Sequence, residues 1–425
     1  MYPWRMLAFL VLFTSHAPAF ASDWPSWRGP TGLGYTDEKD LPLTWSKKGD
    51  NILWKTLLHG GPLKNQDFTS PGWSSPIVWK DRVFLTTAIF PPGLADKERR
   101  EVIAEHHMLA FDAKDGKLLW DTVIPAGKIV TLVENIYHGY AVPTPCTDGT
   151  HVFALFGSGV LACVDFHGKI VWREELPRLK DSDPGICSSP ILHEDMVIVP
   201  GLQDKGLRAL DKKTGKLKWE QNIKFRNTMA TPALIRIKDQ LQLIHYAGGM
   251  QGIDPKTGAI LWSCKAPSSQ SSPVYGGGLL YADAGRGGQL GAAVDPTGTG
   301  DVSRTHLKWQ TRVEGVAGSS AIAVDGHIYR SSGASFIRCW SLKDGAFVHE
   351  IEAKRITPSA SPIATPDGRI YWASPGRTYV LKASPKLEVL AINDLDDGAD
   401  YASAAVAAGK IYIKGRSYLW CIGKK

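Results

Sequence analysis

Arginine and aromatic side chains in short polar turns are the residues of this sequence best suited to bind a ligand. Arg286, Arg377 and Arg416 each stand in a turn between two short runs of β-forming residues, and Arg330 lies near such a turn. A guanidinium can hold a carboxylate, sulfate or phosphate group through two parallel hydrogen bonds. Several of them at one place would bind an anionic ligand, whereas isolated ones would be solvated or paired with a neighbouring Asp or Glu. The fold that positions them decides between these alternatives.

Catalytic motifs are weak by comparison. "FGSGV" (156–160) is similar to the turn that carries a nucleophilic serine, but no helical pattern follows it. "GRGGQLG" (285–291) sits within a predicted hairpin, so it does not fit a dinucleotide-binding turn. His106 and His107 have no further ligand at metal-binding spacing. "NDLDDGAD" (393–400) has its Gly one place early for a calcium loop and lacks the final Glu, which favours an acidic turn. The sequence therefore assigns no catalytic residue and no metal site.

The composition argues against several classes of function. The net charge is +7 over 425 residues, with no long run of like charges and no basic stripe. Nucleic acid is therefore not an expected partner. The six cysteines form no C-x-x-C motif, haem-attachment motif or adjacent pair. Small buried thiols are favoured over disulfide bridges, although both interpretations stay open.

The first 21 residues have the order of an export signal. Arg5 precedes an apolar run over 6–13, and Ala19-Phe20-Ala21 is typical of a cleavage site. The apolar run is too short to cross a bilayer, and no other stretch offers a transmembrane segment. The signal region contains no Cys for a lipid anchor. We therefore expect an exported protein, periplasmic or secreted, that is not lipid-anchored.

A recurring hairpin pattern predicts the elements that position the candidate residues. "ALDKKTGKLKW" (209–219) has a small residue first, Gly seventh and Trp eleventh, and stretches ending at Trp120, Trp172 and Trp262 repeat this spacing. Each copy follows a Ser/Thr-Pro or small-residue strand. The first position of the eight copies falls at Ala110, Ala162, Ala209, Gly252, about Ala293, Cys339, Val380 and Cys421. Four short strands in each unit of about 40 to 50 residues predict an all-β, eight-bladed β-propeller.

The two ends of the chain are predicted to close the ring. The eighth unit (400–425) has only three strands, and residues 50–58 offer a fourth with Trp54 at the matching place. Closure of this kind leaves no unpaired edge at the seam. The residues before this strand are rich in Trp, Pro and Gly, and we expect them to pack along the ring. Residues 22–425 thus form one predicted propeller, preceded by the signal peptide 1–21.

The repeated spacing resembles that of the quinoprotein-like propellers, where it is known as the tryptophan-docking motif. The resemblance covers residues 23–425, and "WPSWRGPTGLG", "SSPIVWKDRVFLTTA" and "TPCTDGTHVFALFGSG" look like exported members of the pyrroloquinoline-quinone-repeat family whose activity is undetermined. It implies that six tryptophans dock on a neighbouring blade: Trp54, Trp120, Trp172, Trp219, Trp262 and Trp309. His349 and Leu390 replace the Trp in the sixth and seventh units, so docking there must differ.

In such a propeller, the loops between blades and those between second and third strands open on one face around the channel mouth. The candidate ligand-binding residues in these loops are Trp73, Tyr140, Arg226, Asn227, Gln270, Arg286, Arg377, Asp400 and Arg416. The aromatic rings among them suit a sugar or a planar ring, and the guanidiniums suit an anionic group. The variable loops, rather than the repeated motif, are therefore expected to determine the ligand.

A strong packing motif beside weak catalytic motifs favours a monomeric binding scaffold at the cell envelope, without retained quinone chemistry. Its partner at the mouth would be a glycan, an envelope component or a protein. The alternative implied by the resemblance is a dehydrogenase with pyrroloquinoline quinone, calcium and an Asp base acting on an alcohol or sugar. The chain lacks the adjacent Cys pair and the haem motif found in parts of that family. A second alternative is an outer-membrane protein assembly component, which is a lipoprotein in that family and so fits the signal region less well.

Overall fold

The computed structural model describes residues 23–58, 72–94, 98, 102–126, 140–176, 186–200, 206–223, 229–246, 248–267, 271–284, 290–313, 318–333, 335–356, 359–373, 376–398 and 401–425. The predicted signal peptide (1–21) lies outside the described residues.

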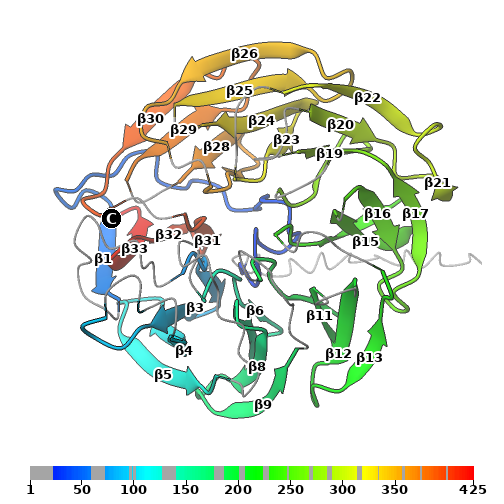
Figure 1. Cartoon of the computed structure of the whole chain (residues 1–425). Helices are drawn as coiled ribbons and strands as arrows, with labels where there is room; N and C mark the ends of the chain where they lie inside the picture. The colour runs from blue at the N-terminus through cyan, green and yellow to red at the C-terminus, as the bar shows by residue number, and fades with distance from the viewer. Residues whose placement is uncertain are drawn as a thin grey trace, which may run out of the picture.

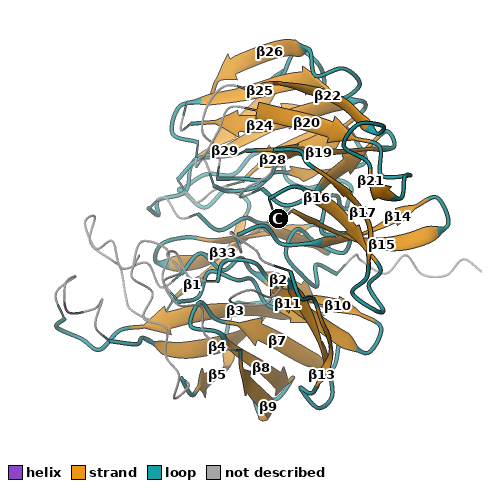
Figure 2. Cartoon of the chain, turned by 45° about the vertical axis from the view of Figure 1, so that its right-hand side comes forward, coloured by secondary structure: helices purple, strands orange, loops and turns teal. Residues whose placement is uncertain are grey.

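Eight small sheets stand around a central axis and form a closed ring (Figure 1). Within the described ranges every named element is a strand, and Figure 2 draws each of them in orange. The predicted all-β, eight-bladed propeller is confirmed.

In every blade four strands run antiparallel from the axis outward, in chain order except that blade 8 takes its outermost strand, β1, from the N-terminal part of the chain. Blade 1 contains β2 (Ile77–Trp79), β3 (Arg82–Ile89), β4 (Glu105–Asp112) and β5 (Leu118–Ile124). Blade 2 contains β6 (Cys146–Thr147), β7 (His151–Leu155), β8 (Val160–Asp165) and β9 (Ile170–Glu175). Blade 3 contains β10 (Ile191–His193), β11 (Met196–Pro200), β12 (Leu207–Asp211) and β13 (Leu217–Glu220). Blade 4 contains β14 (Ala233–Ile237), β15 (Gln240–Tyr246), β16 (Met250–Ile253), β17 (Ile260–Cys264) and the added β21 (Gly300–Asp301). Blade 5 contains β18 (Val274–Gly276), β19 (Leu279–Asp283), β20 (Leu290–Val294) and β22 (Leu307–Arg312). Blade 6 contains β23 (Ile322–Val324), β24 (His327–Ser332), β25 (Phe336–Ser341) and β26 (Phe347–Glu352). Blade 7 contains β27 (Ile363–Ala364), β28 (Arg369–Trp372), β29 (Thr378–Lys382) and β30 (Val389–Asn393). Blade 8 contains β31 (Ala405–Ala407), β32 (Lys410–Lys414), β33 (Tyr418–Gly423) and β1 (Ile52–Leu57).

Burial falls from the axis to the rim. The second strand β11 is buried at every position, while the outermost strand β26 is mostly exposed. The inner strands carry apolar residues on both faces because each is covered by the blades on either side. The core is therefore a series of apolar layers between successive blades rather than one central cluster.

Blade 8 combines the two ends of the described chain. β1 pairs antiparallel with β33, with Trp54 opposite Cys421 and Leu57 opposite Tyr418. The last blade thus takes its outermost strand from the N-terminal part of the chain, which joins the first and last blades without an open seam.

Blade 4 departs from the repeat. Its sheet has a fifth strand, β21, which pairs in parallel with β17 through Trp262 opposite Gly300. β21 comes from the long turn that precedes Trp309 in blade 5. The sequence shows the longer turn, but the periodic pattern carries no signal for an added strand.

The segment before β1 crosses the central channel rather than following the ring, and Figure 1 shows it in dark blue near the centre. It bonds the inner strands of several blades at the ends where these strands finish. Its backbone hydrogen bonds join Trp24 to Val78 in blade 1, Pro25 to Thr147 in blade 2, and Gly34 and Thr36 to Ala364 in blade 7. Residues 24–36 therefore lie across one end of the channel.

A ring of hydroxyl groups, which we call the hydroxyl collar, surrounds the axis where the inner strands begin. These strands are short, so Trp27 of the crossing segment reaches the collar at Ser272. One Ser or Thr stands two residues before the innermost strand of each blade, and its backbone N–H donates to the hydroxyl of the equivalent residue in the next blade. The members, in ring order, are Ser75, Thr144, Ser189, Thr231, Ser272, Ser320, Ser361 and Ser403, which bonds back to Ser75. All are buried. The distances of 2.9 to 3.2 Å show that the blades meet alike at every joint.

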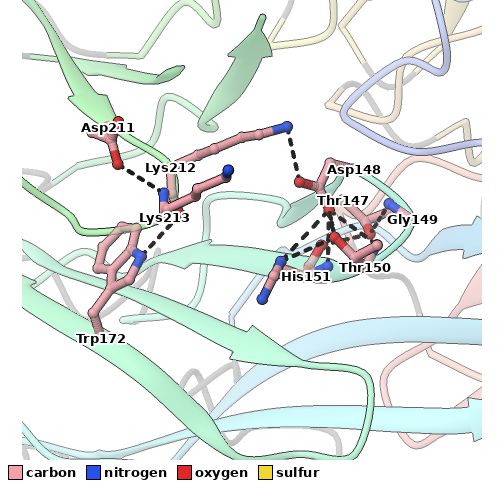
Figure 3. A network of polar contacts seen from close by, with 9 residues as sticks. All are labelled: Thr147, Asp148, Gly149, Thr150, His151, Trp172, Asp211, Lys212 and Lys213. Carbon is pink, nitrogen blue, oxygen red and sulfur yellow. Dashed lines mark hydrogen bonds and ion pairs between the residues drawn. The ribbon is translucent and has the colours of Figure 1, made fainter. Parts of the chain in front are cut away.

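The outer strands also touch across joints, through the predicted tryptophans. Trp172 of blade 2 donates its indole N–H to the Lys212 carbonyl of blade 3 at 2.9 Å (Figure 3). Equivalent bonds join Trp54 to Ala113, Trp120 to Phe166, Trp219 to Pro255, and Trp309 to Leu342. The motif Gly lies beneath the ring, as Gly345 does beneath Trp309, where a Cβ would stand only 2.6 Å from a ring carbon. Gly345 also has φ +73°, which further favours glycine.

All six cysteines lie in the described residues and are free. Five are buried, and burial raises the pKa of Cys163, Cys339 and Cys421 to about 12. The five buried thiols pack as small apolar groups, and burial keeps them protonated.

Candidate functional site

The channel mouth lies at the end of the hydroxyl collar. Each innermost strand begins there and each second strand ends there, so both kinds of variable loop reach this end. The segment 24–36 bonds the inner strands at their other ends. The mouth is therefore the approach to the axis on the side of the collar.

An aromatic pair from two neighbouring blades lies at the mouth. Trp73 precedes β2 of blade 1, Tyr401 precedes β31 of blade 8, and their ring centroids are 4.3 Å apart with planes at 46°. Tyr401 is 41% exposed and Trp73 is half-buried. Each ring supports the other, and the exposed surface that remains is suited to stacking on a sugar, a planar ring or an apolar side chain. We call Trp73 and Tyr401 the mouth pair.

Cationic side chains lie on the blade 8 side of the mouth pair. Lys414, at the end of β32, is buried, and its ammonium group donates to the Gly72 carbonyl at 2.7 Å, directly before Trp73. Arg416 stands in the following turn and packs against Gly398, where a Cβ would be 2.9 Å from its side chain. Aromatic surface and positive charge thus meet at one joint.

Two other arginines near the mouth are paired with carboxylates. Arg377 holds Asp394 through two bonds of 2.8 and 2.9 Å, and this contact raises the pKa of the guanidinium while lowering that of the carboxyl group. Arg330 is fully buried, with its Nε 3.1 Å from Asp283 at the joint of blades 5 and 6. Arg416 packs against Gly398, three residues before Tyr401 in the chain.

The sequence predicts Tyr140, like Trp73, as an aromatic ligand contact. Its side chain is only 2% exposed, its hydroxyl donates to the Val102 carbonyl at 3.3 Å, and its ring packs against Phe90 and His106. The ring therefore belongs to the wall between blades 1 and 2. The remaining predicted residues, Arg226, Asn227, Gln270, Arg286 and Asp400, lie outside the described residues.

The acidic turn after β30 anchors the last blade. Asp397 accepts hydrogen bonds from the backbone N–H groups of Ser417 and Tyr418 and from the indole of Trp420, at 3.0 to 3.1 Å. Burial raises the pKa of this carboxyl group, although these donors oppose the shift. The carboxylate therefore serves to hold the β32–β33 hairpin.

Two histidines are buried with strongly lowered pKa values, which the sequence does not predict. His106 is stacked on Phe156 at 4.4 Å, and neither ring nitrogen has a hydrogen-bond partner. Burial, with smaller contributions from Arg173 and His107, lowers its pKa to about 3. Burial alone has the same effect on His245. Both rings are neutral at neutral pH. In the sequence, only their positions at the ends of apolar runs indicate that they are buried.

The fold and the repeated contacts between blades define a propeller of the quinoprotein-like class. The family model described as "Outer membrane protein assembly factor BamB" (PQQ_2) matches residues 108–350, which is more than half of the 425 residues. The chain belongs to this family of pyrroloquinoline-quinone-repeat propellers.

Known relatives differ in their described activities. Tetrathionate hydrolase of Acidithiobacillus ferrooxidans is 25% identical over 263 residues, or 55% of this chain and 47% of that protein. The chain thus spans about half the length of that curated relative.

The solved structures show the fold alone, because their identities are low. BamB from Moraxella catarrhalis has a TM-score of 0.52 at 17% identity and covers 74% of this chain and 93% of its own. Quinohemoprotein alcohol dehydrogenase ADHIIG from Pseudomonas putida HK5 has a TM-score of 0.63 at 10% identity, with 95% and 81% covered. The enzyme from Comamonas testosteroni scores 0.62 at 12% identity, with the same coverage.

The described residues contain no helix with the length and apolar character needed to cross a membrane. In the same part of the chain, no three His, Cys, Asp or Glu side chains gather as a metal ion requires.

Proposed function

We propose that this protein is an exported binding scaffold of the cell envelope that holds its partner at the channel mouth, without retained quinone chemistry. The observation that carries the proposal is the mouth pair, in which Trp73 and Tyr401 present aromatic surface near Lys414, with Arg416 in the turn that follows β32. Trp, Tyr and Arg are the residues most enriched among binding hot spots. A channel blocked at its far end by residues 24–36 suits a docking face better than a passage.

The partner is a protein or glycan of the envelope. The description of the family and the name of the Moraxella catarrhalis protein support a protein partner. Sugar units would stack on Tyr401, and a partner's apolar side chain would use the same surface. Arg416 would add contacts to carboxylate groups of either class.

The residues present fit calcium poorly. Calcium takes six to eight oxygen ligands, with carboxylates foremost. In the described ranges, the carboxylates near the mouth are held by other groups: Asp394 by Arg377, Asp283 by Arg330 and Asp397 by the β32–β33 hairpin. We therefore derive no reaction step through a calcium-bound quinone.

A quinone-dependent dehydrogenase is the second candidate, and one observation favours it. Asp283 is a buried carboxylate at the mouth end of β19, and it is held by Arg330 and by the Tyr281 hydroxyl at 3.2 Å. A fixed carboxylate of this kind could act as a general base on an alcohol. Asp283 would be that base, and Arg330 would keep it oriented.

Binding measurements on a glycan array and on immobilised envelope proteins test the scaffold. Trp73→Ala and Tyr401→Ala should each weaken binding about tenfold or more, as expected for a hot-spot aromatic residue. Phe347→Ala is the matched control, because this ring is 58% exposed on the outermost strand β26, away from the mouth. If Phe347→Ala weakens binding as much as the mouth variants, the mouth is not the binding face.

Titration with pyrroloquinoline quinone and calcium separates the two candidates. Absorbance reports binding, and dye-linked oxidation of alcohols and sugars reports turnover. The scaffold proposal expects neither at tens of micromolar quinone. Turnover that survives Trp73→Ala and disappears in Asp283→Asn would overturn it in favour of the dehydrogenase.

A further inference from the structure

A buried guanidinium lies in the channel, and no carboxylate of the described residues pairs with it. Arg28 belongs to the segment that crosses the channel and is only 3% exposed. Its Nη2 donates to the carbonyls of Leu33 and Ala321 at 2.8 Å, and its Nη1 donates to the Pro273 carbonyl at 3.4 Å. Its Nε has no hydrogen-bond partner. These acceptors are neutral, so none of them neutralises the positive charge.

The position of Arg28 places this charge next to the hydroxyl collar. Pro273 and Ala321 directly follow the collar members Ser272 and Ser320, and their carbonyls lie on the inner edges of blades 5 and 6. The neighbouring Trp27 donates its indole N–H to the Ser272 hydroxyl at 3.2 Å. The guanidinium therefore lies beside the collar members Ser272 and Ser320, at the level of the residues that directly follow them.

The collar hydroxyls accept hydrogen bonds, but their own protons are not donated to any residue that the structure describes. In the described part of the chain its eight hydroxyl oxygens accept backbone N–H groups, and none of them donates a hydrogen bond to another residue. Buried hydroxyl groups need partners, and an acceptor placed inside the collar would supply one for these protons.

We propose that the channel binds a small oxyanion, a sulfate or carboxylate group, between Arg28 and the collar hydroxyls of blades 5 and 6. A group that only accepts hydrogen bonds matches the free hydroxyl donors, and its negative charge compensates the buried guanidinium. Arg28 keeps its charge at neutral pH, although burial lowers its pKa to about 10. The anion enters from the mouth, because residues 24–36 lie across the other end.

This site goes beyond the proposed docking face and does not depend on it. The mouth pair lies at the joint of blades 8 and 1, whereas Arg28 contacts the inner strands of blades 5 and 6. A free anion and an acidic group on a larger ligand would share the same chemistry. Inorganic sulfate and acetate serve as probes of the free anion, and a short acidic peptide serves as a probe of the attached group.

The test compares sulfate and acetate with chloride at equal ionic strength, by calorimetric titration and by thermal unfolding of the full chain. Sulfate or acetate should bind the native protein and raise its Tm by about 1 to 3 °C at saturating concentration. Arg28→Met should weaken binding about tenfold or more, and Arg28→Lys should restore part of it. Arg377→Met is the matched control, since it removes a guanidinium paired with Asp394, and it should bind sulfate as the native chain does.

Two results would overturn the proposal. One is a native protein that neither binds nor is stabilised by sulfate, acetate or the acidic peptide more than by chloride. The other is undiminished sulfate binding by Arg28→Met or, should that variant fail to fold, by the double variant Ser272→Ala/Ser320→Ala. Trp73→Ala should leave sulfate binding intact, so that failure of the docking face and failure of the anion site are read separately.

Discussion

The inner and outer rings of contacts between blades follow different rules. Near the axis, the hydroxyl collar makes the same N–H to hydroxyl bond at all eight joints. At the rim, an indole bonds a carbonyl of the next blade at five joints of the described structure. The inner strands are crowded together around one axis, so a single geometry satisfies every joint. At the rim the blades diverge, and each joint can be filled differently.

Blades 4, 6 and 7 depart from the indole-to-carbonyl bond at the rim. Trp262 of blade 4 bonds Gln242 of its own blade at 2.8 Å, while β21 adds a strand to the outer edge of that blade. Blades 6 and 7 have His349 and Leu390 where the Trp would stand. The rim therefore tolerates sequence change that the collar does not show.

The largest expected effect comes from the inner half of the ring. Arg330→Met leaves Asp283 as a buried carboxylate without its ion-pair partner, which should cost about 3 to 5 kcal/mol of unfolding free energy. Urea unfolding followed by tryptophan fluorescence measures this loss. The double variant Asp283→Leu/Arg330→Met should recover most of it, because the unpaired charge is gone. A single variant as stable as the native chain would show that the inner joints are not the more demanding ones.

The fold could be predicted from the sequence because the repeat is a packing rule. Gly345 lies beneath the Trp309 ring in the same way that Gly116 lies beneath Trp54, so the motif records contacts between blades. The crossing of the channel by residues 24–36 could not be predicted, because it depends on single long-range contacts such as that of Arg28 with Ala321. Such contacts have no period in the sequence.

At the rim, Trp172→Ala should cost about 2 to 3 kcal/mol, less than the about 3 to 5 kcal/mol typical of a fully buried Trp, because this ring is half-buried. The substitution removes the bond to Lys212 and the packing on Gly215. Trp172→Phe is the control that keeps most of the packing and loses the bond. A loss greater than that of Arg330→Met would reverse the proposed order of inner and outer contacts.

The joint between blades 1 and 2 should be sensitive to acid through His106, which lies in the third strand, between the collar and the rim. The unfolded ring has its ordinary pKa of about 6.5, while burial lowers the folded value to about 3. The unfolded chain thus binds the proton first, and stability is lost as pH falls from about 6.5 toward 3, at about 1.4 kcal/mol per pH unit. His106→Phe should remove this slope, amounting to about 2 kcal/mol at pH 5.

Urea unfolding between pH 7 and pH 4.5 measures that slope. His167→Gln is the matched control, since this ring is exposed to solvent. Equal pH slopes for the native chain and His106→Phe would show that the joint does not sense acid through this residue.

The candidate site was only partly predictable, for the same physical reason. Trp73 and Arg416 could be placed at the mouth from the blade register, but the pairing of Arg377 with Asp394 and the burial of Tyr140 depend on local packing. A register places a residue at a level of the blade. Whether the side chain faces solvent depends on the residues of the next blade, which follow no repeat.

The smallest expected effect is that of one collar hydroxyl. Ser361→Ala removes the acceptor of the Ser320 N–H and leaves a buried donor unpaired, at a cost of about 1 to 2 kcal/mol. If the collar acts as one cooperative ring, a second break three blades away, Thr144→Val, should cost less than the first, because the ring is already open. Independent joints would give costs that add. A double-mutant cycle measured by urea unfolding decides between them, and strict additivity would show that the regular inner ring is a set of separate bonds, no more cooperative than the irregular contacts at the rim.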